Sequence, residues 1–420
     1  MKEFFKVTDL KSVLEHSSDF PRVETEDIPL DESFGRILAV SIDADVDLPD
    51  FMRSTMDDLP DFMRSTMDGY AVRASATFGA SEANPAYLTI KGAVPMGESP
   101  GFSIGSGEAA TISTGGMLPE GADSVVMIEH TEAIDRTTIE VYRSVAPGQH
   151  ILEKGEDIPK GAVLVPDGKR LRPQETGLLA AFGTKTATVY KKPVVGIIST
   201  GDEIVSIHKT PAPGEIRDLN MYTLSGLVRK AGAVPVPFGI VRDDFDDLFK
   251  TCTTALAQTD MVLISGGSSV GTRDFTIDVL SALPESDIFV HGISISPGKP
   301  TILAKSRDLA IWGLPGQVTS TMVVFEIVVK PFIEHISGLS QINEKNFKLS
   351  ARLSRNIASA QGRTEFIRVR LNHKDGILWA DPILGKSGLI NTMVNADGLI
   401  EIALNTEGLD KGTEVEVIPL

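Results

Sequence analysis

The stretch from Pro193 to Gly267 decides the fold of the central part of this chain. Its successive segments are PVVGIIST at 193–200, NMYTLSGLVRKAGA at 220–233, VPVPFGIV at 234–241, DDFDDLFKTCTTALAQ at 243–258 and MVLISGG at 261–267. Apolar runs therefore alternate with amphipathic segments of helical length. Such alternation is typical of βαβ units, so we predict an α/β domain over 191–340 with a parallel sheet covered by helices on both faces.

The segments on either side of this domain have different patterns. From residue 341 to 420, short alternating runs such as TEFIRVRL and TEVEVIPL predict a small β-barrel. Before the α/β domain, strands separated by Gly and Pro, such as AYLTIKGAV and DSVVMIEH, predict an inserted β-rich domain over 55–146. The remaining segments, 1–54 and 147–190, are assigned to an N-terminal helix and a small linking domain. A chain of 420 residues is long enough for several domains.

The segment DLPDFMRSTMD occurs twice without change, at Asp47–Asp57 and again at Asp58–Asp68. Structural repeats recur at longer periods and drift in sequence. We therefore interpret the identity as a recent local duplication or as a cloning or sequence artefact. We expect the added copy to form an extended loop before the second copy, which alone continues into GYAV.

Composition limits the partners and the compartment. A net charge of −17 argues against a nucleic-acid backbone or an anionic membrane as partner, because both demand a basic face. The chain has no apolar run long enough to span a bilayer, and its first residues lack the apolar segment of a secretory signal. Its single cysteine, Cys252, fits a reducing cytosol, so we expect a cytoplasmic protein with Cys252 as a small core residue.

Three glycine-containing loops follow apolar runs of the α/β domain. They are STGDE at Ser199–Glu203, SGGSSVG at Ser265–Gly271 and SPGKP at Ser296–Pro300. Ligands of open parallel sheets bind beyond the carboxyl ends of the strands, where glycines admit a phosphate and hydroxyls donate to it. One such loop alone is more often only a tight connection, but three in one domain favour an anion site. Lys299 is either its cationic partner or a solvated turn residue.

Acidic residues recur beside these loops. They are Asp68, Asp202, Glu203, Asp243, Asp244 and Asp274. Mg²⁺ prefers one or two carboxylates together with ligand phosphates and water, so we predict a magnesium-assisted phosphate reaction. The alternative is that Asp202 and Asp243 cap helices and Asp68 opens an Asp-Gly turn. Motifs of metalloproteases, nucleophile elbows and P-loops are missing from the sequence, which disfavours hydrolytic and P-loop chemistry.

Seven motifs appear in a fixed order along nearly the whole chain: TMDGYAV, ISTGGMLPEGADSVVMIE, GEDI, ISTGDE, SGGSSVG, PGKP and GLPG. Together they resemble the molybdopterin molybdenumtransferase family, which includes the C-terminal domain of gephyrin. The resemblance implies a homodimer of four-domain subunits. It implies a reaction in which adenylylated molybdopterin takes up molybdate or tungstate at its dithiolene and releases AMP with the help of Mg²⁺. It also implies an active site shared by the α/β domain of one subunit and the inserted domain of the other, and the molybdopterin adenylyltransferase as a further partner.

The resemblance also implies roles for individual residues. The catalytic residues it implies are Asp68, Glu203, Asp243, Asp274 and Lys299, and the metal ligands are Asp68, Asp243 and Asp274. The cofactor-binding residues it implies are Thr114, Ser199, Thr200, Gly201, Ser265, Gly266, Gly267, Ser269, Gly298, Arg363 and Ser387, with Arg368 as a further candidate from the barrel.

The chain departs from the family pattern at three places. Many members have lysines just before PGKP, where this chain has Gly292 and Ser296, so we expect weaker attraction for an oxyanion unless His291, Arg273 or Lys154 substitutes. GLPGQVTS replaces the commoner GLPGNPVS, which is expected to alter the start of the following helix. The duplicated segment before Asp68 is expected to displace that carboxylate and to leave a folded but weakly active protein.

Two other functions fit parts of this pattern. The adenylyltransferase of the preceding step has a single α/β domain, so the flanking domains argue against it. A binding scaffold such as the receptor-clustering part of gephyrin needs no acidic residues around the loops. The presence of Asp68, Asp243 and Asp274 therefore favours catalysis.

Overall fold

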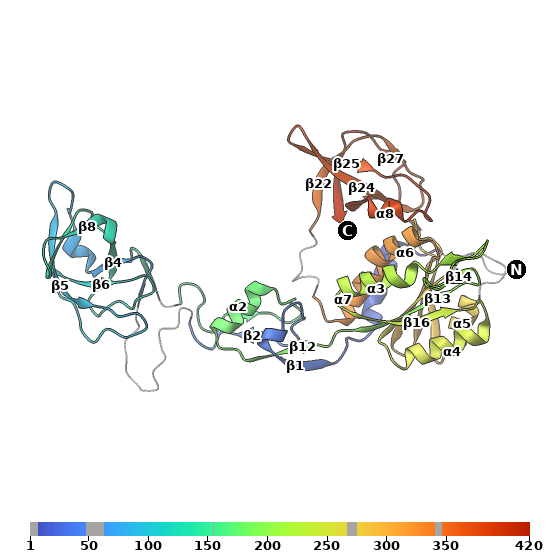
Figure 1. Cartoon of the computed structure of the whole chain (residues 1–420), viewed down its shortest axis with the longest axis horizontal. Coiled ribbons are helices and arrows are strands. Elements are labelled where there is room, and N and C mark those ends of the chain that lie inside the picture. The colour runs from blue at the N-terminus through green and yellow to red at the C-terminus, as the bar shows by residue number, and fades with distance from the viewer. Residues whose placement is uncertain (1–6, 48–62, 154, 267–274, 341–346) are drawn as a thin grey trace. The chain divides into compact units, whose positions relative to one another are not determined.

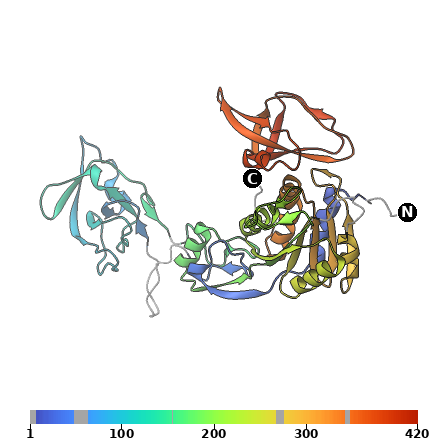
Figure 2. The same ribbon diagram turned by 45° about the vertical axis from the view of Figure 1, so that its right-hand side comes forward.

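The computed structural model describes residues 7–47, 63–153, 155–266, 275–340 and 347–420. The chain divides into two compact units. Unit 1 comprises Met1–Val40, Pro166–Ala180 and Thr184–Leu420, and unit 2 comprises Ser41–Val165 with Ala181–Gly183. Figures 1 and 2 show the elements of each unit from two directions.

A six-stranded sheet forms the centre of unit 1. Its strand order is β16 (Val234–Val241), β13 (Val194–Thr200), β17 (Met261–Ser265), β21 (Leu309–Leu314), β20 (Ile302–Ser306) and β18 (Ser286–His291). The first four strands are parallel, as predicted. The sheet as a whole is mixed, because β20 is antiparallel to both of its neighbours. Only two residues join β20 to β21, with Arg307 in the left-handed region at φ 53°, and so short a link joins antiparallel strands only.

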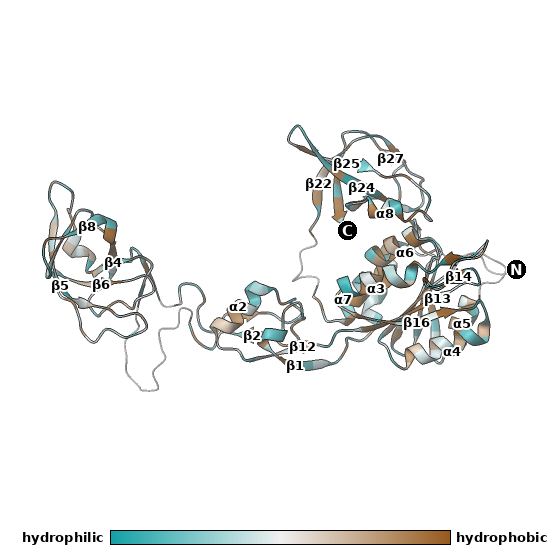
Figure 3. Cartoon of the chain, in the orientation of Figure 1, coloured by the Kyte–Doolittle hydropathy of each residue, from teal (hydrophilic) through white to brown (hydrophobic). Residues whose placement is uncertain are grey.

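Helices cover both faces of this sheet, as predicted (Figure 1). One face carries α3 (Asn220–Lys230) and a continuous helix made of α6 (Val318–Val324), the π-helical η5 (Phe325–Val329) and α7 (Lys330–Ile336). The opposite face carries α4 (Phe245–Leu256) and α5 (Thr276–Ala282). Figure 3 shows hydrophobic residues concentrated in the strands between these layers.

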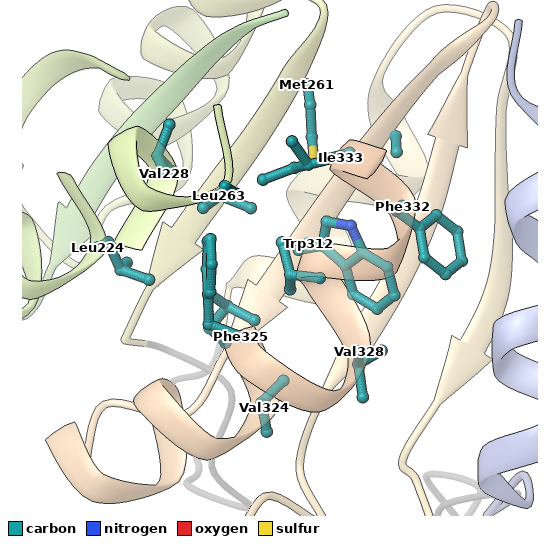
Figure 4. Close-up of a cluster of buried hydrophobic side chains, with 14 of the residues drawn as sticks. Leu224, Val228, Met261, Leu263, Trp312, Val324, Phe325, Val328, Phe332 and Ile333 are labelled. Atoms are coloured by element: carbon teal, nitrogen blue, oxygen red, sulfur yellow. The ribbon is translucent and has the colours of Figure 1, made fainter. Parts of the chain in front are cut away.

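The pleat of β17 divides the core between the two faces. Met261 and Leu263 pack with the α3 and α7 layer, whereas Val262 and Ile264 pack with α4 and α5. Figure 4 shows the first of these clusters, where the Trp312 ring meets Phe332 edge-on with the centroids 4.9 Å apart. Burial on both faces explains why the strand sequences read as continuous apolar runs.

Cys252 lies on α4 in the second cluster and is fully buried. Burial raises the pKa of its thiol to about 12, because the thiolate would lose its hydration. Its expected role as a core residue is confirmed.

The C-terminal part of unit 1 is a closed five-stranded barrel, as predicted. Its strands are β24 (Thr364–Lys374), β25 (Ile377–Pro382), β22 (Leu349–Leu353), β28 (Glu414–Pro419) and β26 (Gly398–Ile402), and β26 pairs back to β24. The short β19 (Ile295–Ser296) of the α/β domain pairs in parallel with the start of β24. Smaller elements complete the barrel: β23 (Ile357–Ala358), β27 (Gly408–Leu409) and α8 (Asn391–Val394).

The remainder of unit 1 begins with α1 (Leu10–Glu15), whose N-cap Asp9 accepts a hydrogen bond from the backbone N–H of Ser12 at 3.0 Å. After it, β1 (Thr25–Pro29) pairs antiparallel with β12 (Thr186–Tyr190). The other short elements of this region are η1 (His16–Asp19), η2 (Leu30–Glu32) and α2 (Pro173–Ala181), while β14 (Ile204–Val205) and β15 (Ile216–Arg217) form a small ribbon after β13.

Unit 2 is β-rich, as predicted. Its sheet has the order β7 (Ser124–Met127), β4 (Gly69–Val72), β6 (Glu108–Ile112), β5 (Ala86–Ala93), β9 (Thr138–Val141) and β8 (Thr131–Ala133), with η3 (Ala74–Thr77) and η4 (Ile128–His130) in its connections. Two short pairs join its entering and leaving segments: β2 (Ile42–Asp43) with β11 (Val163–Val165), and β3 (Arg64–Ser65) with β10 (Ile151–Leu152). The predicted boundary at 54/55 and the loop expected from the duplication lie outside the described residues, so both stay predictions.

Candidate functional site

Several strand ends of the α/β domain meet at one edge of its sheet. The strands β13, β16, β17 and β21 are parallel and end at Thr200, Val241, Ser265 and Leu314. The strand β18 also ends there, because it is antiparallel to β20, which is antiparallel to β21. We call this the carboxyl edge. The loops STGDE, SGG, SPGKP and GLPG all begin at it.

A side-chain hydrogen bond joins the STGDE loop, which follows β13, to the loop that follows β16. Thr200 Oγ1 donates to Asp243 Oδ1 at 2.6 Å, and the backbone N–H of Asp243 donates to Asp202 Oδ1 at 3.4 Å. The helix cap of α4 is the next residue, Asp244, which accepts from the backbone N–H groups of Asp246 and Asp247. Asp243 is thus not a helix cap, and its half-buried carboxylate is held against the end of β13.

Gly266 allows the backbones of three strand ends to touch. Its φ is +110°, and a Cβ at this position would lie 2.1 Å from the carbonyl oxygen of Thr200. Its backbone N–H donates to the carbonyl of Leu314 at 3.3 Å. No side chain fits there, so Gly266 presents a bare backbone at the carboxyl edge.

Asn220 also belongs to this edge, and the sequence interpretation missed it. Its Nδ2 donates to Ser265 Oγ at 2.6 Å and to the carbonyl of Gly316 in the GLPG loop at 2.8 Å. Only 8% of Asn220 is exposed. In the sequence an asparagine at the start of a helix looks like an ordinary cap, so no local signal distinguishes it.

The other candidates of the STGDE loop differ in exposure. Ser199 is buried within the sheet, in register with Ser265, whereas Glu203 is exposed at the edge. Gly201 is buried and packs against Glu203, whose Oε2 would lie 2.9 Å from an added Cβ. Glu203 therefore faces solvent, as does Asp202 of the same loop.

The SPGKP loop lies at the same edge. Gly298 has φ +117° and packs so tightly against Val324 that a Cβ would lie 2.3 Å from its Cγ2. Lys299 follows it and is exposed. Of the expected substitutes for the missing lysines, His291 is partly buried, and burial lowers its pKa, which favours the neutral imidazole. Arg273 and Lys154 lie outside the described residues, as do the candidates Gly267, Ser269 and Asp274.

The three barrel candidates lie in different surroundings. Arg363 forms an ion pair with the buried Glu365 near β19. Arg368 is 7% exposed; its Nη1 donates to Thr392 Oγ1 at 3.0 Å, and burial lowers its pKa. The carbonyl of Ser387 accepts a hydrogen bond from the backbone N–H of Thr319 at 3.1 Å.

That bond places Ser387 at the second residue of α6, directly after the GLPG loop. The helix α6 itself begins without a side-chain cap, because Gln317 at the N-cap makes no such hydrogen bond.

In unit 2, Asp68 and Thr114 form a polar corner, which we call the Asp68–Thr114 corner. Asp68 Oδ1 accepts hydrogen bonds from the backbone N–H of Thr114 at 2.7 Å and from its Oγ1 at 3.1 Å. Both residues are exposed. The next residue, Gly69, lies so close to a neighbouring strand that a Cβ would be 2.0 Å from the carbonyl oxygen of Val126. Asp68 therefore not only precedes the Asp-Gly turn but also connects its own loop to the loop of Thr114 by two hydrogen bonds.

The described residues include no group of three or more His, Cys, Asp or Glu side chains arranged to hold a metal ion. The three predicted metal ligands are divided: Asp243 belongs to unit 1, Asp68 to unit 2, and Asp274 lies outside the described residues. A metal at the carboxyl edge would need further ligands from substrate or water, which is the usual arrangement for Mg²⁺.

Comparison with known proteins identifies the family. Three family models match in order: "MoeA N-terminal region (domain I and II)" over residues 58–183, "Probable molybdopterin binding domain" over 196–335 and "MoeA C-terminal region (domain IV)" over 350–420. A molybdopterin molybdenumtransferase of Bacillus subtilis is 34% identical over 94% of this chain and 90% of its own length. The chain belongs to the molybdopterin molybdenumtransferase family. It is therefore a transferase of molybdenum cofactor biosynthesis.

Other relatives agree with this family. A putative molybdopterin biosynthesis protein of Methanocaldococcus jannaschii is 35% identical over 97% of this chain and 96% of its own length. A crystal structure of a molybdopterin biosynthesis MoeA protein from Pyrococcus horikoshii has a TM-score of 0.82 and 32% identity, covering 99% of this chain and 100% of that one. Among the described residues, no helix is both long and apolar enough to cross a membrane.

Proposed function

We propose that this chain inserts molybdenum from molybdate, or tungsten from tungstate, into the dithiolene of adenylylated molybdopterin and releases AMP. The family supports the reaction class. The observation that carries the proposal is the meeting of Thr200, Asp243 and Gly266 at the carboxyl edge, where the hydrogen bond at 2.6 Å and the bare glycine backbone lie together. The glycine leaves room for a phosphate to approach the backbone closely beside a carboxylate.

The chain's own groups have separable tasks in this reaction. Gly266 leaves room for the phosphates to approach the backbone, the Ser265 hydroxyl donates a hydrogen bond to them, and the exposed Lys299 offsets their charge. Glu203 and Asp243 lie beside them as carboxylates. Metal insertion needs an oxyanion held next to the dithiolene, and cleavage of the phosphate bond needs its charge neutralised. Neither step needs a protein nucleophile, which agrees with a buried Cys252 whose pKa is raised.

Mg²⁺ fits the donor set of the carboxyl edge. Asp243 is half-buried with one carboxylate oxygen held by Thr200, and a Mg²⁺ ion commonly binds one or two carboxylates and takes its other ligands from phosphates and water. Asp243 would hold it, with Asp274 as the second predicted ligand. Bound there, Mg²⁺ supplies positive charge to the phosphates at the bond that breaks.

We also propose that the protein acts as a homodimer in the cytoplasm, with the adenylyltransferase as the source of its substrate. In this arrangement the Asp68–Thr114 corner of one copy serves the carboxyl edge of the other. The corner supports this role because its carboxylate is fixed by two hydrogen bonds yet remains exposed. A single buried cysteine suits a reducing compartment.

The test is AMP release from adenylylated molybdopterin with Mg²⁺, comparing molybdate, tungstate and no added oxyanion. We expect release that depends on the oxyanion, and the faster oxyanion identifies the preferred metal. Release without any oxyanion would indicate hydrolysis in place of insertion. If nothing is released by the chain, nor by a version with one copy of the duplicated segment, the proposal is wrong and a binding role is favoured.

A further inference from the structure

The side-chain amide of Asn220 connects two loops of the carboxyl edge that are distant in sequence. Its Nδ2 donates to Ser265 Oγ at the end of β17 and to the carbonyl oxygen of Gly316 after β21. Its Oδ1 is buried and has no hydrogen-bond partner among the described residues. A buried amide oxygen without a hydrogen-bond partner lowers the stability of the fold. A buried asparagine in this position therefore needs a compensating role, such as the orientation of the groups that its nitrogen contacts.

The orientation of this amide follows from chemistry. A carbonyl oxygen can only accept, so the Gly316 carbonyl requires the amide nitrogen to face it. The same nitrogen faces Ser265 Oγ. An amide nitrogen cannot accept, so the Ser265 hydroxyl oxygen must be the acceptor of that bond. The single hydroxyl proton of Ser265 is then left for another acceptor.

The position of Asn220 is fixed by its neighbours along the chain. Asp218 is 5% exposed; its Oδ1 accepts from the backbone N–H of Met221 at 3.0 Å, and its own N–H donates to the carbonyl of Val205 at 2.9 Å. These bonds fix the start of α3 relative to the chain that leaves β13. Asn220 therefore presents its amide to Ser265 from a rigid support.

We propose that Asn220 is a positioning residue that sets the Ser265 hydroxyl as a hydrogen-bond donor to an anionic oxygen of the bound molybdopterin nucleotide. The inference rests on the proposed function and names how one of its ligand contacts is made. Substitution of Asn220 by Asp keeps the shape but replaces the donor by an acceptor. The Ser265 proton then turns toward the new carboxyl group and is lost to the ligand.

The test measures the dissociation constant for adenylylated molybdopterin without added oxyanion, so that no turnover occurs. The variants are Ser265→Ala, Asn220→Asp, Asn220→Ala and the two double variants, with thermal melting of each. In the wild-type background we expect Ser265→Ala to weaken binding on the order of 10- to 100-fold, the usual range for a hydrogen bond to a charged group. In the Asn220→Asp background the same Ser265→Ala change should have almost no effect, because the hydroxyl no longer donates to the ligand.

Asn220→Ala is the second route if Asn220→Asp does not fold. Without the amide, the Ser265 hydroxyl is free to rotate. In the Asn220→Ala background, Ser265→Ala should therefore weaken binding of adenylylated molybdopterin less than it does in the wild-type background. The matched control is Asn356→Asp, an exposed asparagine of the barrel whose Oδ1 only accepts a hydrogen bond, from the backbone N–H of Lys411. It adds the same charge and should leave binding unchanged.

The inference would be overturned if Ser265→Ala weakened binding by the same factor in the wild-type, Asn220→Asp and Asn220→Ala backgrounds. An Asn220 with a merely structural role would not change the contribution of the Ser265 hydroxyl to ligand binding. A wild-type chain that binds no adenylylated molybdopterin would instead overturn the proposed function, and this inference with it.

Discussion

The carboxyl edge of unit 1 and the Asp68–Thr114 corner of unit 2 hold their polar groups in different ways. At the carboxyl edge, Thr200 and Asn220 are almost fully buried, and their hydrogen bonds run between separate strands and helices. At the corner, both residues are exposed and one carboxylate oxygen makes the two hydrogen bonds. Changes that disturb the packing of the buried groups at the edge should therefore alter stability and function together. Changes at the corner, and changes at the edge that keep the hydrogen bonds, should alter function alone.

The largest effect is expected for Gly266→Ala. The new Cβ would lie 2.1 Å from the Thr200 carbonyl oxygen in a backbone conformation that disfavours side chains. We expect a loss of roughly 3 kcal/mol or more in the free energy of unfolding, together with loss of AMP release. Thermal melting and the AMP assay measure the two. Gly239→Ala is the control, because Gly239 has φ +89° with open space around it, and it should cost only about 1 kcal/mol. Equal losses of unfolding free energy in Gly266→Ala and Gly239→Ala would refute the close contact between Gly266 and the Thr200 carbonyl oxygen.

Asp243→Asn should separate charge from structure at the carboxyl edge. The amide oxygen can still accept from Thr200, so melting should change little, whereas AMP release should fall by roughly 100-fold or more because the negative charge is gone. Raising the Mg²⁺ concentration should restore part of the rate. Asp246→Asn, at an exposed position in the first turn of α4, is the control and should retain full activity. Full activity of Asp243→Asn would remove this carboxylate from the mechanism.

Asp68→Asn tests the corner. The amide oxygen retains the contact with the backbone N–H of Thr114, so we expect an unchanged melting temperature and AMP release lowered on the order of 10-fold. Unit 2 contains a matched control, Asp135, whose Oδ1 accepts from the backbone N–H of Thr137 at 2.7 Å and from its Oγ1 at 2.8 Å. Asp135→Asn should leave the rate unchanged. If both variants lose activity equally, the corner has no special role.

The smallest effect is expected from removing one copy of the duplicated segment, residues 48–58. The family model for the N-terminal region matches only from residue 58, so the second copy is the one that continues into the family pattern. We expect an unchanged melting temperature and a few-fold rise in the rate of AMP release. The reason is that the segment leading to the Asp68–Thr114 corner would then be shorter by one copy of the repeat. A fall in activity after the deletion would indicate that the longer connection is part of the working protein.

Much of the architecture follows from local sequence patterns. The alternation of apolar runs and helical segments predicts the α/β domain, because strands buried on both faces need apolar residues at successive positions, as in Met261–Ser265. The alternating runs after residue 341 predict the barrel in the same way. The direction of β20 was missed, because it depends on the tight turn at Arg307 and not on the composition of the strand.

The sequence by itself determined the family, the layer structure and which loops carry donors and carboxylates, because each of these is written in neighbouring residues. The tertiary structure alone decided which of those groups meet. The partners Thr200 and Asp243 are 43 residues apart, and Asn220 reaches across 45 residues to Ser265 and 96 residues to Gly316. No local pattern records such contacts, since they arise only when parallel strands bring their carboxyl ends to one edge.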